Sequence, residues 1–225
     1  MCGRFTLTTT IEKILTHLQL PFAENFDYKP RYNIAPTQQV LSVIGSDLGK
    51  TLTYFKWGLI PTWAKDQSIG SRMINARSET LNEKPSFKPL ISYNRCAIIA
   101  DGFYEWKTTQ HGKQPYRILR HDQNPFAFAG LWTTWQSPDG EKIRSCTIIT
   151  TKANSLVEQV HDRMPVILTA KSLDLWLDTS LNRFLDLEEV LIPYPADQLT
   201  MYPVSKLVNS PKNDTIDCIK PDHLA

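Results

Sequence analysis

The chain has no long hydrophobic run. None of its apolar stretches approaches the roughly 18 residues that a membrane-spanning helix requires, so no membrane span is predicted. A secretory signal is not predicted either, because Arg4 is followed by threonines and not by an apolar segment. We therefore expect a cytoplasmic protein with no membrane partner.

Cysteine is scarce, and its residues lie far apart. The four cysteines form no C-x-x-C pair and have no spacing suited to zinc: Cys2, Cys96, Cys146 and Cys218. The sequence therefore predicts no metal site. Cys96 and Cys146 lie within apolar runs and are expected to be buried thiols, which fits a reducing, cytosolic compartment.

Several common catalytic signatures are missing. The sequence contains no G-x-x-x-x-G-K-[ST], no H-E-x-x-H and no G-x-S-x-G motif. The usual nucleotide-binding, zinc-protease and serine-hydrolase interpretations therefore lose their main support. We expect no cofactor, and in particular no nucleotide cofactor.

An excess of charge of one sign is also missing. The formal net charge is +2, and 41% of the residues are hydrophobic, as in an ordinary globular protein. Residues 1–113 hold 14 Lys/Arg against 9 Asp/Glu, whereas residues 114–225 hold 11 against 14. A basic face built mainly from the first half would suit phosphates, although many ordinary surfaces show a similar imbalance.

Hydrophobic periodicity predicts a single α+β domain. A helix is expected over 10–18, opened by a capping box of Thr9 and Glu12. Further helices are expected from Asn75 and over 87–93, 153–160, 171–178 and 181–189. Strands are expected over 39–45, 52–60, 95–100, 103–107, 115–120, 126–133, 144–151, 166–168 and 201–205. With no repeat and no linker, these elements predict one domain with a mainly antiparallel sheet, curled towards a barrel and flanked by helices. We expect this domain to be a monomer, although no pattern in the sequence shows the oligomeric state.

The N-terminus carries distinctive chemistry. Methionine aminopeptidase normally removes a methionine before a residue as small as cysteine, so we expect Met1 to be removed. Cys2 would then carry an amine and a thiol on adjacent carbons, with ordinary pKa values of about 7.7–8.0 and about 8.5. Such an aminothiol condenses with an aldehyde to an imine, and its thiol then closes a five-membered thiazolidine. On position alone, an inert residue in a frayed terminus is the commoner outcome.

Two further residues are candidates for proton transfer. Glu105 lies among aromatic residues in Gly102-Phe103-Tyr104-Glu105-Trp106, where desolvation would raise the pKa of its carboxyl towards neutrality. A solvated position on an edge strand is the commoner alternative. His161 follows a predicted helix, where a histidine is either a proton shuttle or, more often, a cationic cap.

Other polar and aromatic side chains suit DNA. Asn75 precedes a predicted helix and is interpreted first as its N-cap, and otherwise as an amide that orients a substrate oxygen. Arg4, Arg77 and Arg163 would suit phosphates, and Trp63 would suit stacking on an unpaired base. Taken singly, each is more often part of a solvated surface or of the core.

Taken together, the motifs resemble those of the SOS response-associated peptidase (SRAP) family. They follow the family's order across nearly the whole chain: Cys2-Gly3-Arg4-Phe5, Tyr32-Asn33-Ile34-Ala35-Pro36, Trp57-Gly58 with Pro61 and Trp63, Asn75-Ala76-Arg77-Ser78-Glu79-Thr80, Ala100-Asp101-Gly102-Phe103-Tyr104-Glu105-Trp106, His161-Asp162-Arg163-Met164-Pro165, and more loosely Pro203-Val204-Ser205 with Val208-Asn209. Each motif is modest alone, but their joint occurrence is specific. Many members carry a second aromatic residue directly after the tryptophan, where this chain has Ala64.

The resemblance implies one SRAP domain over 1–225 that binds single-stranded DNA and covalently captures abasic sites in the DNA damage (SOS) response. Cys2 would be the cross-linking nucleophile, and Asn75 would position its amine and the opened sugar. Glu105 would handle protons during imine formation and ring closure, and His161 would assist opening of the sugar to its aldehyde. The positions that match the family's DNA-binding residues are Arg4, Trp63, Arg77, Thr150 and Arg163.

Three other functions stay open. A peptidase with an N-terminal nucleophile would use Cys2, Glu105 and His161 on an amide bond. An abasic-site lyase would let the imine eliminate before the thiol closes, and we expect this as a side reaction. A non-catalytic reader of single-stranded DNA would not use Cys2. Denaturation-resistant adducts, strand cleavage without adducts, and peptide turnover that depends on Cys2 would distinguish these functions.

Overall fold

The larger of two sheets closes into a barrel. The computed structural model describes residues 2–21 and 27–222. In it, β10 (Lys142–Lys152) pairs antiparallel with β9 (Phe126–Gln136) and parallel with β4 (Gly49–Trp57). From β4 the pairing continues through β3 (Gln39–Ser46) and β6 (Arg95–Ala100) back to β9. Three short strands extend this barrel: β5 (Asn75–Arg77) and β11 (Arg163–Pro165) on β10, and β12 (Ile167–Leu168) on β9.

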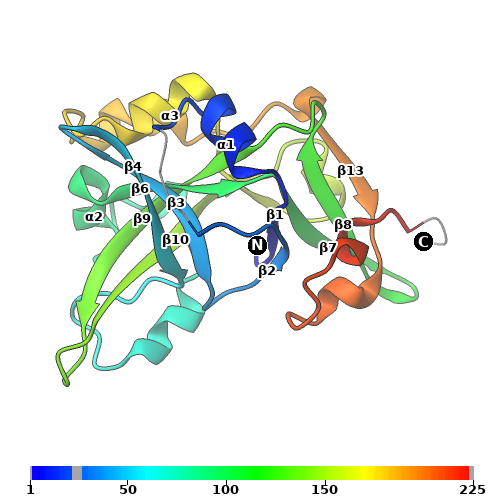
Figure 1. Ribbon diagram of the computed structural model, residues 1–225, viewed down its shortest axis with the longest axis horizontal. Helices are drawn as coiled ribbons and strands as arrows, with labels where there is room; N and C mark the ends of the chain where they lie inside the picture. The colour runs from blue at the N-terminus through cyan, green and yellow to red at the C-terminus, as the bar shows by residue number, and fades with distance from the viewer. Residues whose placement is uncertain (1, 22–26, 223–225) are drawn as a thin grey trace.

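The second sheet has five strands and lies beside the barrel (Figure 1). Its order is β13 (Leu199–Pro203), β8 (Gly112–Arg120), β7 (Gly102–Thr109), β1 (Phe5–Leu7) and β2 (Arg31–Ile34), with every pair antiparallel. The predicted mainly antiparallel, barrel-like α+β fold is therefore confirmed, with parallel pairing added at β10.

Helices cover the outside of the barrel. They are α1 (Ile11–His17), α2 (Lys88–Tyr93) and α3 (Ala170–Leu177). The buried indole of Trp176 joins α3 to β6, since its Nε1 donates to the Cys96 carbonyl at 2.9 Å. Short 3₁₀ segments lie between these elements: Gln67–Arg72, Ser78–Thr80, Val157–Gln159, Phe184–Asp186, Glu188–Val190, Ala196–Gln198, Lys206–Asn209 and Ile216–Ile219.

The core joins the two sheets beneath the N-terminal strand. Phe5 of β1 is fully buried, and its ring meets Trp57 edge-on at 5.2 Å and Phe128 at 5.7 Å between centroids. Edge-to-face pairs of this kind add to the stabilisation that comes from burying aromatic area. Phe5 therefore fixes β1 against the barrel only three residues after Cys2.

Several sequence predictions of helices were wrong. The N-cap of α1 is Thr10, whose side chain accepts the Lys13 amide, so the predicted Thr9 capping box does not form. Asn75 begins strand β5 and caps no helix. The helix predicted over 153–160 is a turn, because the Asn154 side chain accepts the Leu156 and Val157 amides and closes the chain early. The segment over 181–189 forms two 3₁₀ turns.

The described residues form neither a membrane-spanning helix nor a metal-binding cluster. Residues 2–21 and 27–222 contain no helix with both the length and the apolarity to cross a membrane. The same part of the chain contains no group of three or more His, Cys, Asp or Glu residues arranged to hold a metal ion. Met1, whose removal the sequence predicts, lies outside the described residues.

Candidate functional site

The N-terminal segment lies between strands of both sheets. Cys2 is fully buried, with its Sγ 3.9 Å from the Arg4 carbonyl oxygen. Its own carbonyl accepts a hydrogen bond of 2.8 Å from Nδ2 of Asn75, the first residue of β5. On the other side, the Tyr104 amide donates to the Arg4 carbonyl at 2.9 Å, which continues the pairing of β1 with β7. Cys2 is thus held by the barrel and by the second sheet.

Glu105 is the buried acid of this site. It follows Tyr104 on β7, and only 3% of its surface is exposed. Burial, with a further contribution from the negative charge of Asp162, raises the pKa of its carboxyl to about 7. Burial first, and then the charge of Glu105, also raises the pKa of the Cys2 thiol. The predicted desolvated carboxyl is present, and at neutral pH it can both donate and accept a proton.

His161 lies in the turn between the 3₁₀ segment Val157–Gln159 and strand β11. Its Nδ1 is 2.9 Å from the Arg163 amide nitrogen and 2.8 Å from Asp162 Oδ1. The first contact suits an unprotonated Nδ1 and the second a protonated Nδ1, so the neutral ring finds a partner in either tautomer. Partial burial lowers the pKa of His161, which favours this neutral ring. Such a ring is suited to moving protons in either direction.

Asn75 is positioned by parallel strand pairing. Its register partner on β10 is Ile148, and Arg77 is opposite Thr150 two residues later. With Nδ2 donating to Cys2, the side-chain oxygen Oδ1 is left buried and without a hydrogen-bond partner among the described residues. A buried acceptor without a partner is costly, and a bound hydroxyl group would satisfy it.

Comparisons with known proteins agree with the sequence motifs. A sequence model of the family described as SOS response associated peptidase (SRAP) matches residues 1–211. The chain belongs to the SRAP family.

Named relatives of this SRAP chain come from bacteria and animals. The chain is 49% identical to the abasic site processing protein YoqW of Bacillus subtilis, over 98% of this chain and 99% of that protein. It is 32% identical to YedK of Escherichia coli over 98% of this chain, and the match covers 100% of YedK, which is also named as an abasic site processing protein. A crystal structure of a Bacteroides thetaiotaomicron protein superposes with a TM-score of 0.86 at 25% identity, covering 98% of this chain and 100% of that one.

The five predicted DNA-binding residues have unequal surroundings in this SRAP fold. The Trp63 side chain is 62% exposed, and Arg77 is also exposed. Arg4 is half-buried, and its Nη1 donates to Asn33 Oδ1 at 2.8 Å and to the Val208 carbonyl at 2.7 Å. The remaining two, Thr150 and Arg163, are buried.

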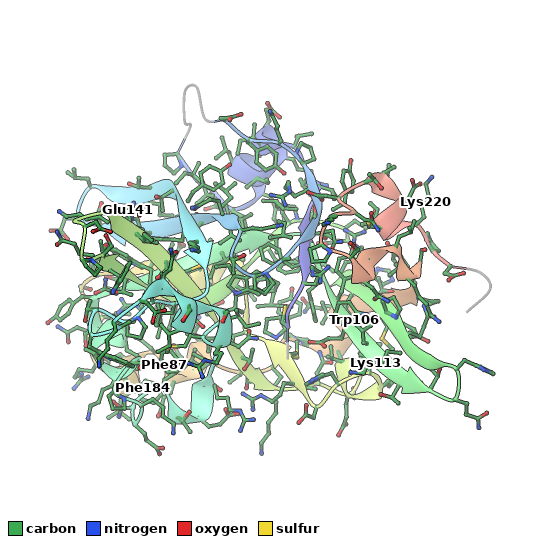
Figure 2. The ribbon with its side chains drawn as sticks, turned by 90° about the horizontal axis from the view of Figure 1, so that it is seen from below. Phe87, Trp106, Lys113, Glu141, Phe184 and Lys220 are labelled. Atoms are coloured by element: carbon green, nitrogen blue, oxygen red, sulfur yellow. The ribbon has the colours of Figure 1, made fainter. Side chains whose placement is uncertain are left out.

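Trp106 is a further aromatic residue near Arg4 that the sequence analysis did not select as a site residue. Its Nε1 donates to Asn209 Oδ1 at 2.7 Å, and its ring lies 6.0 Å from the Arg4 guanidinium carbon. Figure 2 shows Trp106 on the β7–β8 side of the molecule, far from Glu141 on the opposite side. The motif around Glu105 contains this tryptophan, but its neighbours come from distant parts of the chain.

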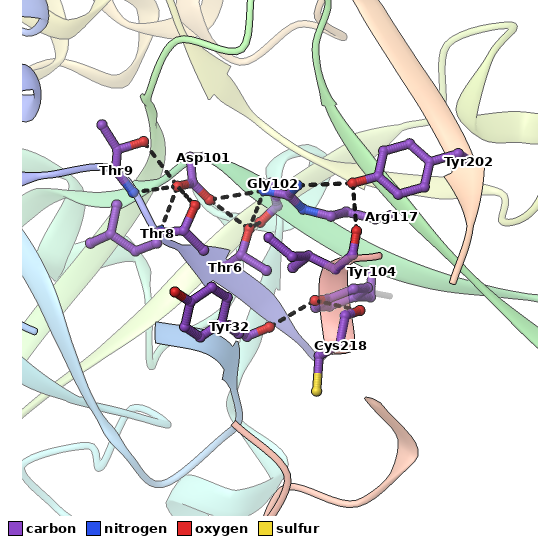
Figure 3. Close-up of polar contacts among 12 residues, drawn as sticks. Thr6, Thr8, Thr9, Tyr32, Asp101, Gly102, Tyr104, Arg117, Tyr202 and Cys218 are labelled. Atoms are coloured by element: carbon purple, nitrogen blue, oxygen red, sulfur yellow. Dashed lines mark hydrogen bonds and ion pairs between the residues drawn. The ribbon is translucent and has the colours of Figure 1, made fainter. Parts of the chain in front are cut away.

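Asp101 anchors the N-terminal strand of this SRAP domain (Figure 3). Its buried carboxylate accepts hydrogen bonds from the hydroxyls of Thr6, Thr8 and Thr9 and from two of their amides. Buried Arg117 lies 3.3 Å from the same carboxylate. The sequence motif contained Asp101, but only the fold shows that it fixes the strand leading to Cys2. The sequence signal for this anchoring role was the position of a polar residue between the apolar run 95–100 and the aromatic run 103–106.

Proposed function

We propose that this protein binds single-stranded DNA and joins Cys2 covalently to ring-opened abasic sites as a thiazolidine. The names of its relatives support abasic sites as the substrate. The hydrogen bond from Asn75 to the Cys2 carbonyl carries the proposal, because it fixes the N-terminal residue beside the buried Glu105. We further propose that the protein acts as a cytoplasmic monomer in the DNA damage response.

The proposed reaction needs Met1 to be removed, so that Cys2 has a free amine. The amine nitrogen adds to the aldehyde carbon of the opened sugar, and water leaves to give an imine. The thiol sulfur then adds to the imine carbon, and the nitrogen takes up the proton that the thiol gives up. The net change is the loss of one water.

The surroundings of Cys2 suit these proton transfers. Burial raises the pKa of the Cys2 thiol, so a nearby base must take its proton before the sulfur attacks. Glu105, whose pKa is about 7, would donate a proton to the departing hydroxyl and later accept the thiol proton. His161 would move protons as the sugar opens, and the unsatisfied Oδ1 of Asn75 would accept a sugar hydroxyl.

The proposed binding surface combines the half-buried Arg4 and the exposed Arg77 with the exposed aromatic side chain of Trp63. Arg4 and Arg77 would contact phosphates without reading sequence, and Trp63 would stack on a neighbouring base. Thr150 and Arg163 complete the set that the family resemblance implies, at the buried end of the site. A base-free nucleotide offers no base edge, so this set needs no base-reading residue.

The proposal is tested by intact mass before and after incubation with an abasic single-stranded oligonucleotide. We expect loss of Met1, followed by a gain equal to the oligonucleotide mass minus one water. The Cys2→Ala variant should lose the stable adduct and still bind the DNA, since its arginines are unchanged. An oligonucleotide without the abasic site is the matched control.

Other experimental results would reject the proposed function or favour a different one. Retained Met1 without any adduct would reject the aminothiol trap, and normal cross-linking by Cys2→Ala would remove Cys2 from the chemistry. Strand cleavage without an adduct would favour the lyase. An unchanged rate of adduct formation in Glu105→Gln would exclude Glu105 from proton transfer.

A further inference from the structure

Arg4 is held by groups that carry no charge. Its Nη1 donates to Asn33 Oδ1 at 2.8 Å and to the Val208 carbonyl at 2.7 Å, which uses both N–H groups of that nitrogen. In the part of the chain that the structure describes, no carboxylate forms an ion pair with Arg4. Other arginines of the same part do have such a partner: Arg31, Arg117, Arg120, Arg163 and Arg183.

The side-chain amide of Asn33 can face Arg4 in only one orientation. Asn33 is fully buried, and its Nδ2 donates to the carbonyls of Val208, Ser210 and Asn213 at 3.2, 3.0 and 2.6 Å. Carbonyl oxygens only accept hydrogen bonds, so the NH₂ end of the amide must lie on their side. The oxygen end therefore faces the guanidinium of Arg4, for which it is an acceptor.

Asn33 also holds the second acceptor of Arg4. The Val208 carbonyl accepts from Nη1 of Arg4 and from Nδ2 of Asn33, which lies 175 positions away on β2. The next residue, Asn209, accepts the Nε1 hydrogen bond of Trp106, whose ring lies 6.0 Å from the Arg4 guanidinium carbon. One buried asparagine thus fixes the chain segment that supplies the surroundings of Arg4.

This arrangement leaves the charge and one terminal nitrogen of Arg4 for a ligand. Nη2 makes no hydrogen bond with any of the described residues, and the side chain is only half-buried. Neutral acceptors hold the guanidinium without cancelling its charge, as a carboxylate would. An arginine that is charged and already oriented binds a phosphate oxygen at a smaller entropic cost than a mobile one.

We infer that Asn33 is a positioning residue for DNA binding, which orients Arg4 towards a phosphate and leaves its positive charge uncompensated. This role rests on the proposed function, which supplies the phosphate that Arg4 would contact. Asn33 is fully buried, so it would act through Arg4 and touch no DNA itself. Its loss should therefore change the affinity for DNA and not the chemistry at Cys2.

The Asn33→Ala variant tests this role by removing both ends of the amide. Affinity for an unmodified single-stranded oligonucleotide should fall by about 5- to 10-fold, less than the loss of a whole charge-assisted hydrogen bond. The rate of adduct formation with a saturating abasic strand should stay within about 2-fold of wild type. If Asn33 only stabilised the N-terminal segment, this rate would fall, because the Arg4 carbonyl contacts Cys2.

A double-mutant cycle shows whether the effect passes through Arg4. Arg4→Gln should weaken binding by about 10- to 100-fold and reduce the log–log salt slope by about 0.7, as expected for one lost phosphate contact. When Arg4 is already Gln, adding Asn33→Ala should change the affinity by less than about 2-fold. Fully additive losses would show that Asn33 acts independently of Arg4.

Two further variants separate orientation from folding. Asp214 accepts the amides of Tyr32 and Asn33 and so ties the same C-terminal segment to β2, but among the described residues it forms no hydrogen bond with Arg4. Asp214→Asn should lower the melting temperature without weakening DNA binding. Asn33→Asp has nearly the same size as wild type and covers the case in which Asn33→Ala does not fold. Its carboxylate would pair with Arg4, so affinity and salt slope should fall as in Arg4→Gln.

The outcomes separate the role of Asn33 from the proposed function. If the wild type binds no single-stranded DNA, or if Arg4→Gln binds normally, the proposed phosphate contact fails and the positioning role fails with it. If only Arg4→Gln binds weakly, while both Asn33 variants bind normally, the positioning role alone is overturned. It is also overturned if Asp214→Asn weakens binding as much as Asn33→Ala. Weak binding with a normal saturated rate and a non-additive cycle supports it.

Discussion

The site residues associated with the two sheets form two groups, and these groups differ in burial. The second sheet provides Cys2 and Glu105, which are 0% and 3% exposed. The barrel and its attached strands provide the partly exposed Asn75 and His161 and the exposed Arg77, besides the buried Thr150 and Arg163. The difference fits the function proposed above, in which the buried group, the dry wall, would hold protons near neutral pH and the more exposed group, the wetter wall, would contact the DNA.

We expect the largest loss of stability from a change at Asp101, which anchors the N-terminal strand on the side of the dry wall. Asp101→Ala should lower the free energy of unfolding by about 3–5 kcal/mol, because it leaves buried Arg117 without its carboxylate and frees the threonines of the N-terminal segment. Urea denaturation measures this loss. The exposed Asp139→Ala is the control and should change stability by less than about 0.5 kcal/mol. A loss below about 1 kcal/mol for Asp101→Ala would contradict the anchoring role.

The next effect concerns the pH dependence of stability, and its sign is expected to differ between the two walls. Burial raises the pKa of Glu105 to about 7. The neutral carboxyl therefore contributes its full stabilisation of the fold below the usual pKa of a glutamate, and this contribution is lost as pH rises through about 7. Glu105→Gln should therefore be about 2–3 kcal/mol more stable than wild type at pH 8 and nearly equal to it at pH 5. Urea unfolding at the two pH values checks this.

Glu79→Gln is the matched variant on the wetter wall. The hydrogen bond from Arg163 lowers the pKa of Glu79, so its charged form stabilises the fold above its usual pKa and this stabilisation is lost as pH falls through the lowered value. This variant should be less stable than wild type at pH 8. Equal signs for the two variants would show that the walls do not differ in this way.

A third prediction tests whether the wetter wall binds DNA. Trp63 is 62% exposed, so Trp63→Ala should change stability by less than about 0.5 kcal/mol. It should weaken single-stranded DNA binding by about 5- to 30-fold, which corresponds to one lost stacking contact. Fluorescence anisotropy with an unmodified oligonucleotide measures the affinity. Tyr93→Ala, at an exposed aromatic residue on α2, is the control and should bind normally.

The sequence predicted local elements of the fold better than distant pairings. The strands around Glu105 were predicted because short runs of apolar and aromatic residues bounded by turn residues are a local signal. Asn75 was misassigned to a helix cap, because its strand conformation comes from parallel pairing with Ile148, 73 residues away by sequence number. Closure of the barrel by β4 and β10 is equally non-local, so periodicity had no means of showing it.

The same limit applies to the site. Cys2, Asn75 and Glu105 were identified from their motifs, and the structure brings them together. The motifs also placed Arg163 among the phosphate contacts, while its side-chain partner Glu79 is separated from it by 84 positions. A motif shows which residues accompany a function, but the hydrogen bonds that divide the work among them are set by tertiary structure.

The smallest expected effect is a pair of pKa shifts, which tests whether one charge acts on titrating groups of both walls. Asp162 is exposed, and its carboxylate lies 2.8 Å from His161 Nδ1, yet its charge also raises the pKa of buried Glu105. Asp162→Asn should therefore lower the pKa of both His161 and Glu105, while stability changes by less than about 0.5 kcal/mol, as expected for a solvent-exposed pair. NMR titration of the imidazole and of the carboxyl carbon measures the two shifts, with Asp139→Asn as a distant control. If the pKa of His161 falls and that of Glu105 does not, the two walls titrate independently. The proposed proton transfer at the imine would then have to be assigned to Glu105 on the dry wall alone.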